Sequence, residues 1–257
     1  MTATIQARSE PAHVLITGAS SGIGAALALA YAAPGVRLAI FGRDEVRARE
    51  VAEGCRAKGA LVAVVLVDVT DQEAMADAVA LVDDAHPVDL AIANAGVAGA
   101  SLGHEDGIAR LFAINVMGVV HMVEPLIARM TARGSGQIAL MSSLASFVVR
   151  PGTEGYCASK AAVRVWGEGL RQRLAPKGVA VSVICPGFVD TPLTRRNRFP
   201  MPMLMEVEPA ARLIRAKLAR GQAQIAFPWP LYLGARLAGL LPAGVQRLAT
   251  ARWPGKE

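Results

Sequence analysis

The 257-residue chain is poor in aromatic residues (5%), in charged residues (19%) and in cysteine. Its three cysteines, Cys55, Cys157 and Cys185, are far apart and lack the spacing of a metal site. This pattern indicates reduced thiols rather than a disulfide framework or a structural zinc. The four histidines form no ligand pattern either. We therefore expect no bound metal ion.

Long apolar runs are also missing, although 53% of the residues are hydrophobic and the mean hydropathy is +0.37. A membrane-spanning helix needs about 20 consecutive apolar residues. The longest apolar segment, residues 229–241, is interrupted by Arg236. The first ten residues, MTATIQARSE, lack the apolar stretch of a secretory signal. These absences favour a cytoplasmic protein.

The net charge of +6 is unevenly distributed, because residues 191–257 contain 11 Lys and Arg against 3 Asp and Glu. These basic residues are not interleaved with aromatic residues and form no DNA-binding helix motif, so nucleic acid is not an expected partner. An anionic substrate group, an acidic membrane surface or solvated helix faces would each account for them.

Short apolar runs alternate with longer segments of helical periodicity, which is typical of repeated βα units. Because the apolar runs do not alternate with polar residues, we expect strands that helices cover on both faces. The predicted strands are 13–18, 36–41, 61–67, 88–93, 137–142, 179–185 and 223–227, and the predicted helices are 22–33, 44–58, 71–84, 106–131, 155–175 and 208–220. The sequence therefore predicts an α/β fold, a Rossmann-like doubly wound three-layer sandwich with a seven-stranded parallel sheet, as a single domain over residues 1–257.

A glycine-rich turn joins the first predicted strand to the first helix in LITGASSGIGAALALA, residues 15–30. Gly18, Gly22 and Gly24 permit a tight turn, close approach of the backbone to a pyrophosphate, and close packing of helix on sheet. The N-terminus of the helix would then face the anion. This context favours nucleotide binding over an ordinary turn.

Tyr156 and Lys160 lie four positions apart in GYCASKAA, residues 155–162, on one face of a predicted helix. A free tyrosine has a pKa of about 10, so it is a poor base near neutrality unless a nearby positive charge stabilises the phenolate. Lys160, together with the positive charge of an oxidised nicotinamide, could lower the pKa of Tyr156 into the working range.

With T-G-x-x-x-G-x-G and Tyr-x-x-x-Lys in this order, the chain resembles the short-chain dehydrogenase/reductase family over nearly its whole length. The resemblance extends to DVT at 68–70, NAG at 94–96, Asn115, SS at 142–143 and PGFVDT at 186–191. It implies an oxidoreductase that interconverts a carbonyl and a secondary alcohol by hydride transfer with a nicotinamide cofactor.

The same resemblance implies four catalytic residues, in which Tyr156 moves the proton and Lys160 assists it. Ser143, thirteen residues before Tyr156, would hydrogen-bond the substrate oxygen, and its neighbour Ser142 fits the family interval less well. Asn115 would position a water next to Lys160 and complete a proton relay.

The resemblance also implies the contacts of the cofactor. Asp68 and Val69 would flank the adenine, Asn94 and Gly96 would line the ribose on the adenosine side, and Thr191 would hold the carboxamide. Taken singly, Asp68 could instead cap the next helix, and Thr191 could simply begin a proline turn. The expected cofactor contacts are Gly18, Ser20, Ser21, Gly22, Ile23, Gly24, Arg43, Asp68, Val69, Asn94, Gly96, Tyr156, Lys160, Pro186, Gly187, Val189 and Thr191.

The end of the second predicted strand favours NADP(H) over NAD(H). An NAD site usually has a carboxylate there for the ribose hydroxyls, whereas this chain has Gly42 followed by Arg43. A guanidinium suits a 2′-phosphate, and Ser21 could add a hydroxyl donor. Alternatively, Arg43 merely precedes a helix capped by Asp44, and Asp44 could pair with Arg43.

Two later segments are candidates for the substrate side. Residues 191–209 contain FPMPMLM, whose methionines would form an adaptable apolar wall for a lipophilic ketone, aldehyde or alcohol, or would pack in the core or between subunits. The apolar and basic extension 228–257 resembles two short amphipathic helices separated by Pro242. It could cover the active site, extend a subunit interface or lie on a membrane, and the first two are favoured.

Two other functions remain open. A catalytically silent NAD(P)-binding regulator would usually lack the tyrosine or the lysine, and both are present. A dehydratase or epimerase on this scaffold would usually have a larger C-terminal domain. Family members are commonly homodimers or homotetramers, joined through helices that correspond to 155–175 and 208–220.

Overall fold

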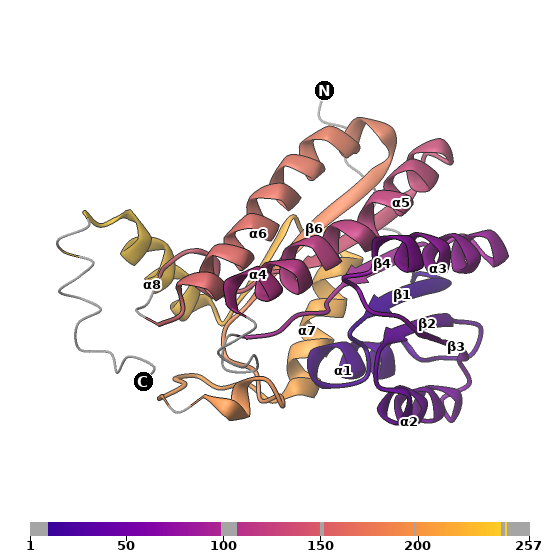
Figure 1. The fold of residues 1–257 in the computed structure, drawn as a ribbon, viewed down its shortest axis with the longest axis horizontal. Coiled ribbons are helices and arrows are strands. Elements are labelled where there is room, and N and C mark those ends of the chain that lie inside the picture. Colours follow the sequence, from indigo (N-terminus) through magenta and orange to yellow (C-terminus); the bar gives the residue numbers. More distant parts are fainter. Residues whose placement is uncertain (1–9, 99–106, 150–151, 198, 243–244, 246–257) are drawn as a thin grey trace.

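The computed structural model describes residues 10–98, 107–149, 152–197, 199–242 and 245, and its middle layer is a parallel sheet of seven strands (Figure 1). The strand order is β3-β2-β1-β4-β5-β6-β7. All seven predicted strands are confirmed, with ends shifted by up to two residues. They are β1 His13–Thr17, β2 Arg37–Gly42, β3 Leu61–Leu66, β4 Leu90–Ala93, β5 Gly136–Met141, β6 Val179–Pro186 and β7 Gln224–Phe227.

Helices cover both faces of this sheet, as a doubly wound fold requires (Figure 1). One core lies under α1 Gly22–Tyr31, α2 Glu45–Arg56 and α7 Val207–Ala219. The other lies under α3 Gln72–Ala85, α5 Gly118–Ala132 and α6 Glu154–Leu174. The three-layer Rossmann-like sandwich is thus confirmed. A last helix, α8 Trp229–Leu240, packs beside β7.

The strands supply both cores because alternate side chains point to opposite faces. In β1, Ile16 packs with the α1 side and Leu15 with the α3 side, and both are fully buried. The expectation of burial on both faces is wrong for β3, where Leu61 and Leu66 are exposed. β3 is an edge strand with a neighbour on one side, so less of it is covered.

The predicted helix 106–131 is interrupted. The chain forms α4 Gly107–Phe112, then a π-helical turn, Ala113–Met117, and then α5. Short π segments occur frequently at functional sites, and this one contains Asn115. Among the described residues, Gly107–Ala132 is the one helical stretch long and apolar enough to span a membrane, but half of it is buried inside the fold. We interpret it as a core helix.

The carboxyl ends of the parallel strands meet at one edge of the sheet. From β1 the chain moves outward to β2 and β3, and then returns to place β4 on the other side of β1. Open α/β sheets bind ligands at such a reversal point, outside the carboxyl ends. The glycine loop follows β1, Asn94 follows β4, and Ser142 and Ser143 follow β5, so the predicted site gathers at this edge.

The packing of α6 on the sheet gives a stability prediction. A Cβ atom at Gly167 would lie 2.6 Å from Val183 Cγ2 and 2.7 Å from Leu140 Cδ1, whereas one at Gly169 would meet nothing within 4 Å. We expect Gly167→Ala to destabilise the fold by about 1–3 kcal/mol through overpacking. The matched control Gly169→Ala should be neutral or stabilise α6 by up to about 1 kcal/mol. Thermal unfolding of both variants measures this, and equal Tm values would contradict the described packing.

Candidate active site

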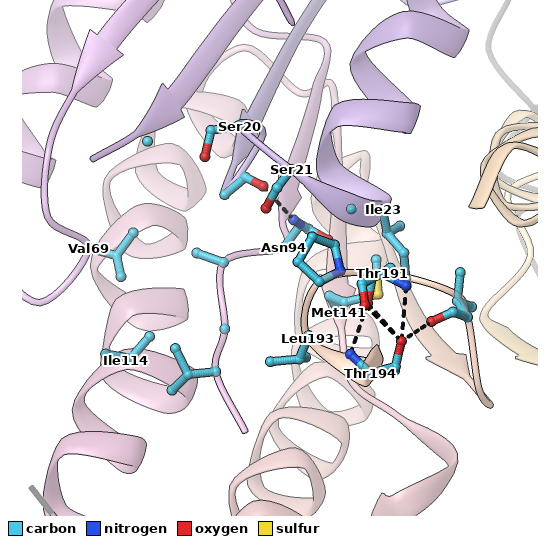
Figure 2. A pocket seen from close by; sticks show the side chains of 18 of the residues that line it. Ser20, Ser21, Ile23, Val69, Asn94, Ile114, Met141, Thr191, Leu193 and Thr194 are labelled. Carbon is cyan, nitrogen blue, oxygen red and sulfur yellow. Dashed lines mark hydrogen bonds between the residues drawn. The ribbon is translucent and has the colours of Figure 1, made fainter. Parts of the chain in front are cut away.

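A cavity of about 720 Å³ lies at the carboxyl ends of the strands (Figure 2). Ser20, Ser21 and Ile23 approach it from the β1–α1 connection, Val69 and Ile114 from one side, and Thr191 and Thr194 from the other. Every predicted site residue lines this cavity except Gly24 and Asn115. Both exceptions lie directly behind its wall, where they contact residues that do line it.

The N-terminus of α1 is open, unlike those of α2 and α3. Asp44 and Asp71 cap α2 and α3 by accepting hydrogen bonds from backbone amides. At α1 the N-cap Ser21 makes no side-chain cap hydrogen bond, and the first turn contains no acidic residue. Helix N-termini have unpaired N–H groups and a partial positive charge, so this one is suited to a phosphate.

The glycine loop has no room for side chains. Gly18 has φ +63°, and a Cβ there would lie 2.8 Å from Ala95 Cα. A Cβ at Gly24 would collide with Gly18 O and lie 2.5 Å from Asn94 Nδ2. The absence of a side chain at Gly24 therefore lets α1 pack closely against the glycine loop, in agreement with the packing role predicted for it.

Asn94 connects the ends of β1 and β4. Its Nδ2 donates to Thr17 O at 3.0 Å and to Gly18 O at 3.2 Å, and its backbone amide donates to Thr17 Oγ1 at 3.1 Å. Because one of these bonds reaches the glycine loop itself, Asn94 holds the loop against the sheet while it lines the cavity. Thr17, the first residue of the T-G-x-x-x-G-x-G motif, is the other half of this contact.

Arg43 forms an ion pair across the ends of β2 and β3. Its Nη1 lies 2.9 Å from Asp68 Oδ2, so the pairing with Asp44 that the sequence left open does not form. Asp44 instead caps α2 and pairs with Arg47. Burial acts to raise the pKa of Asp68, but hydrogen bonds from Thr70 and the Arg43 guanidinium outweigh it, and the pKa is lowered. Asp68 does not cap α3, since Asp71 does.

Tyr156, Ser143 and Lys160 converge on one end of the cavity. Lys160 is 4% exposed, and its Nζ lies 5.9 Å from the centroid of the Tyr156 ring and donates to Met141 O at 3.0 Å. The Ser143 hydroxyl accepts from the Ala145 amide at 3.1 Å and faces the phenol of Tyr156. The neighbouring Ser142 is buried and donates to Lys160 O at 2.7 Å, so its hydroxyl is occupied in holding α6.

Burial governs the protonation of this group. It raises the pKa of Tyr156 to about 12, although the Ser143 hydroxyl opposes it, and it lowers the pKa of Lys160 to about 8. The expected lowering of the tyrosine pKa is therefore not a property of the protein alone. A second positive charge next to the phenol, such as that of an oxidised nicotinamide, is needed to bring it toward neutrality.

Asn115 lies fully buried behind the lysine. Its Oδ1 accepts from the Val97 amide at 2.8 Å, and its Nδ2 donates to Val97 O at 2.9 Å and to Ser159 Oγ at 3.1 Å. A Cβ at Gly96 would lie 3.2 Å from both Asn115 Oδ1 and Lys160 Nζ. Asn115 and Lys160 thus meet at Gly96, and Ser159, which sequence reasoning missed, connects Asn115 to the helix that carries Tyr156.

The loop after β6 covers the start of α1. A Cβ at Gly22 would lie 3.2 Å from Thr191 Cγ2, and the Thr191 amide donates to Thr194 Oγ1 at 2.9 Å (Figure 2). Thr191 therefore does begin a turn, and it also lines the cavity. The cavity wall here is formed by Pro192, Leu193, Thr194 and Arg196.

The methionines of the same segment lie elsewhere. Met201, Met203 and Met205 do not line the cavity, and Met205 packs against the core on the α1 side. The alternative of core packing is thus correct for Met205, and the expected methionine wall is not part of this cavity. Of the predicted C-terminal helices, α8 is present, and the one beyond Pro242 lies almost wholly outside the described residues.

The remaining lining residues that sequence reasoning missed include Arg47, Val97, Ile114 and Met141. Arg47 lies one turn into α2 from Arg43, and helical spacing could have indicated it. The others carry no chemical signal in the sequence, since apolar residues next to strand ends are ordinary core residues. The cavity as a whole fits a dinucleotide, with an open helix N-terminus at its centre, Arg43 at one end and Tyr156 at the other.

A family comparison agrees with this geometry. The model of the short chain dehydrogenase family matches residues 12–200. The chain belongs to the short-chain dehydrogenase/reductase family and is one of its oxidoreductases.

Individual relatives give the same family. An uncharacterized oxidoreductase of Myxococcus xanthus is 38% identical over 232 residues, which cover 89% of this chain and 92% of the relative. The gluconate 5-dehydrogenase of Gluconobacter oxydans is 32% identical over 189 residues, covering 72% and 74%.

Solved structures are similar throughout their length. A short-chain dehydrogenase from Sphingobium yanoikuyae in complex with NADPH has a TM-score of 0.76 at 26% identity, covering 95% of this chain and 97% of that one. A bulky-bulky ketone specific alcohol dehydrogenase from Comamonas testosteroni has a TM-score of 0.74 at 27% identity, covering 90% and 95%.

The buried lysine gives a pH-dependent stability prediction for the cofactor-free protein. Because the folded pKa of Lys160 is about 8 and its ordinary value is 10.5, the unfolded chain binds more protons between these two values. Stability should therefore rise with pH in this window. From about pH 7 to about pH 9.5, the wild type should gain about 2 kcal/mol relative to Lys160→Met. Urea unfolding at both pH values measures the difference, and a parallel response of the two proteins would contradict a depressed lysine pKa.

Proposed function

We propose that this oxidoreductase uses NADP(H) to interconvert a carbonyl and a secondary alcohol on a lipophilic substrate, in the cytoplasm and as a homo-oligomer. The observation that supports the chemistry most is the convergence of Tyr156, Ser143 and Lys160 at one end of a cavity whose middle is an open helix N-terminus. The nicotinamide would supply or accept the hydride at this end.

The side chains would handle the proton and the substrate oxygen. In reduction, the Ser143 hydroxyl donates a hydrogen bond to the carbonyl oxygen, and the phenol of Tyr156 transfers its proton to that oxygen as the carbon gains the hydride. The resulting phenolate lies close to the Lys160 ammonium, which stabilises it. Oxidation of the alcohol reverses each transfer. Asn115, through Val97 and Ser159, fixes the positions of the loop and helix on which this depends.

Arg43 and Gly42 support the preference for NADP(H). The lining of the cavity at β2 has no carboxylate at the strand end itself, and a Cβ at Gly42 would approach nothing closer than Ser20 Oγ at 3.5 Å. Asp68 holds Arg43 over this open space. A 2′-phosphate would share the guanidinium with Asp68, because Asp68 accepts from Nη1 of Arg43 and the guanidinium has further N–H donors. The similar Sphingobium yanoikuyae structure is a complex with NADPH.

A lipophilic substrate is favoured by the apolar residues Val97, Ile114, Met141 and Leu193 in the cavity wall. Two similar proteins are named for different classes of substrate. One structural neighbour is named as specific for bulky ketones, whereas one relative is named as a gluconate dehydrogenase. A panel of aliphatic and aromatic ketones against keto sugar acids, in which NADPH oxidation is measured, decides between them. A preference for the sugar acids would overturn the lipophilic assignment.

Replacement of the tyrosine tests the reaction itself. Tyr156→Phe removes the transferable proton and keeps the ring, so we expect kcat on an accepted ketone to fall by at least about 100-fold with NADPH binding within a few-fold of wild type. Kinetics and fluorescence titration of NADPH measure the two effects. The control is Tyr232→Phe, outside the cavity lining, which should turn over normally. Wild-type turnover by Tyr156→Phe would contradict the mechanism, and a wild type that binds NADPH but reduces nothing would favour a silent regulator.

Replacement of the arginine tests the cofactor choice. Arg43→Ala should weaken NADPH binding by about 10–100-fold, because one charge-assisted contact is lost, and should leave NADH binding nearly unchanged. Arg49→Ala is the matched control, since Arg49 lies on α2, the helix that begins just after Arg43, pairs with Glu45 and does not line the cavity. Titration of both cofactors against both variants gives the ratio. An unaltered preference in Arg43→Ala would assign the selectivity to other residues.

A further inference from the structure

The helix α8 has an inner face that packs against the turn after Ser143. The 3₁₀ turn Leu144–Ser146 follows that serine, and Phe147 comes next. The Phe147 and Tyr232 rings meet edge to face at 5.3 Å, and the Arg236 guanidinium lies 5.5 Å from the Phe147 ring centroid. A Cβ at Gly239 would collide with Phe147 O. One side of α8 thus packs against the rest of the fold.

The opposite side of α8 is apolar and uncovered. Trp229, Leu233, Leu237 and Leu240 recur at intervals of three and four residues, so they lie on one face of the helix. All four are exposed, Trp229 by 68% and Leu240 by 78%. We call these four residues the outer stripe of α8. Figure 1 shows the helix at the periphery of the molecule, outside the three layers.

This distribution is unusual for a surface helix, which normally presents charged residues to water. Over its twelve residues α8 contains a single charge, Arg236, and that guanidinium lies on aromatic rings at the border of the inner face. A helix that is apolar on both sides is normally buried on both sides. We therefore expect the outer stripe to be covered by another apolar environment outside this fold.

The charges of the sequence from α8 onward indicate the nature of that environment. Residues 229–257 contain Arg236, Arg247, Arg252 and Lys256 against one acidic residue, Glu257. An isologous contact between two α8 helices would pair two chain segments that are both basic in sequence. An anionic surface is complementary to them instead, and a tryptophan with leucines on one face and basic residues nearby is typical of helices that lie in a lipid interface.

We propose that the outer stripe of α8 docks on an anionic phospholipid surface, with the helix lying in the plane of the interface. The binding is reversible, because one short helix with a few basic residues buries little apolar area. Docking through α8 also brings the turn after Ser143, and so the active-site end of the cavity, next to the lipid. The proposal does not depend on the reaction, because vesicle binding is measured without substrate.

The test is co-sedimentation of the full chain with vesicles of phosphatidylcholine and phosphatidylglycerol, against vesicles of phosphatidylcholine alone. We expect binding to the anionic vesicles, weakened at least about tenfold in the double variant Leu233→Asp/Leu237→Asp, since two leucines no longer enter the apolar phase. The matched control is Leu81→Asp, where the leucine is 71% exposed on α3, a helix without Lys or Arg. Its binding should equal that of wild type.

Further measurements distinguish lipid binding from misfolding and from self-association. Thermal unfolding and NADPH binding of the double variant should match wild type, because both leucines are exposed. In the wild type, brominated phospholipids should quench the tryptophan emission, which requires no variant. Absence of binding to anionic vesicles, or equal binding by the double variant, overturns the proposal. So does a double variant whose only change is a smaller mass by light scattering, since the stripe would then contact a second copy.

Discussion

The buried ammonium of Lys160 is the constraint on which the rest of the site depends. Placing this charge inside the fold is unfavourable, as its lowered pKa shows, so its surroundings must orient donors and acceptors around it. Met141 O accepts a hydrogen bond from the ammonium, and the Ser142 hydroxyl donates one to the backbone carbonyl of Lys160. Gly96 leaves a space beside the ammonium that any side chain would fill. The end of β5, the loop after β4 and the helix α6 are therefore held in one arrangement. The position of Tyr156 follows from that arrangement, since it lies one turn earlier on the same helix.

The sequence predicted most of this half of the molecule because its chemistry depends on groups with few substitutes. A tight loop against a phosphate requires glycine at Gly18 and Gly24, and a phenol with an ammonium one turn away requires Tyr156 and Lys160. The strands could be predicted equally well, since parallel strands covered on both faces are runs of Val, Ile, Leu and Ala. The edge strand β3 is the exception, because periodicity does not say which strand lies at the edge.

Contacts between distant segments could not be predicted in the same way. The ion pair of Arg43 with Asp68 joins residues 25 positions apart, and from the sequence the nearer Asp44 was the partner considered. The π turn at Asn115 could not be predicted from the sequence either, because the residues around it have an uninterrupted helical pattern. In both cases the sheet order decides the outcome: β2 and β3 are neighbours, and the helix after β4 must pass directly behind the lysine.

The least predictable part begins after β6, where composition alone was a poor guide to position. The methionines expected at the cavity lie outside its wall, while Leu193, Thr194 and Arg196, which carry no motif, form that wall. This half of the cavity is built from turns held by local hydrogen bonds, such as those in which the Thr194 hydroxyl accepts from the Thr191 amide and donates to Val189 O. The proton-transfer group, by contrast, is joined to β4, β5 and α6 at once, so the sheet and its helices fix the geometry of this group but leave the loop after β6 largely to its own local turns.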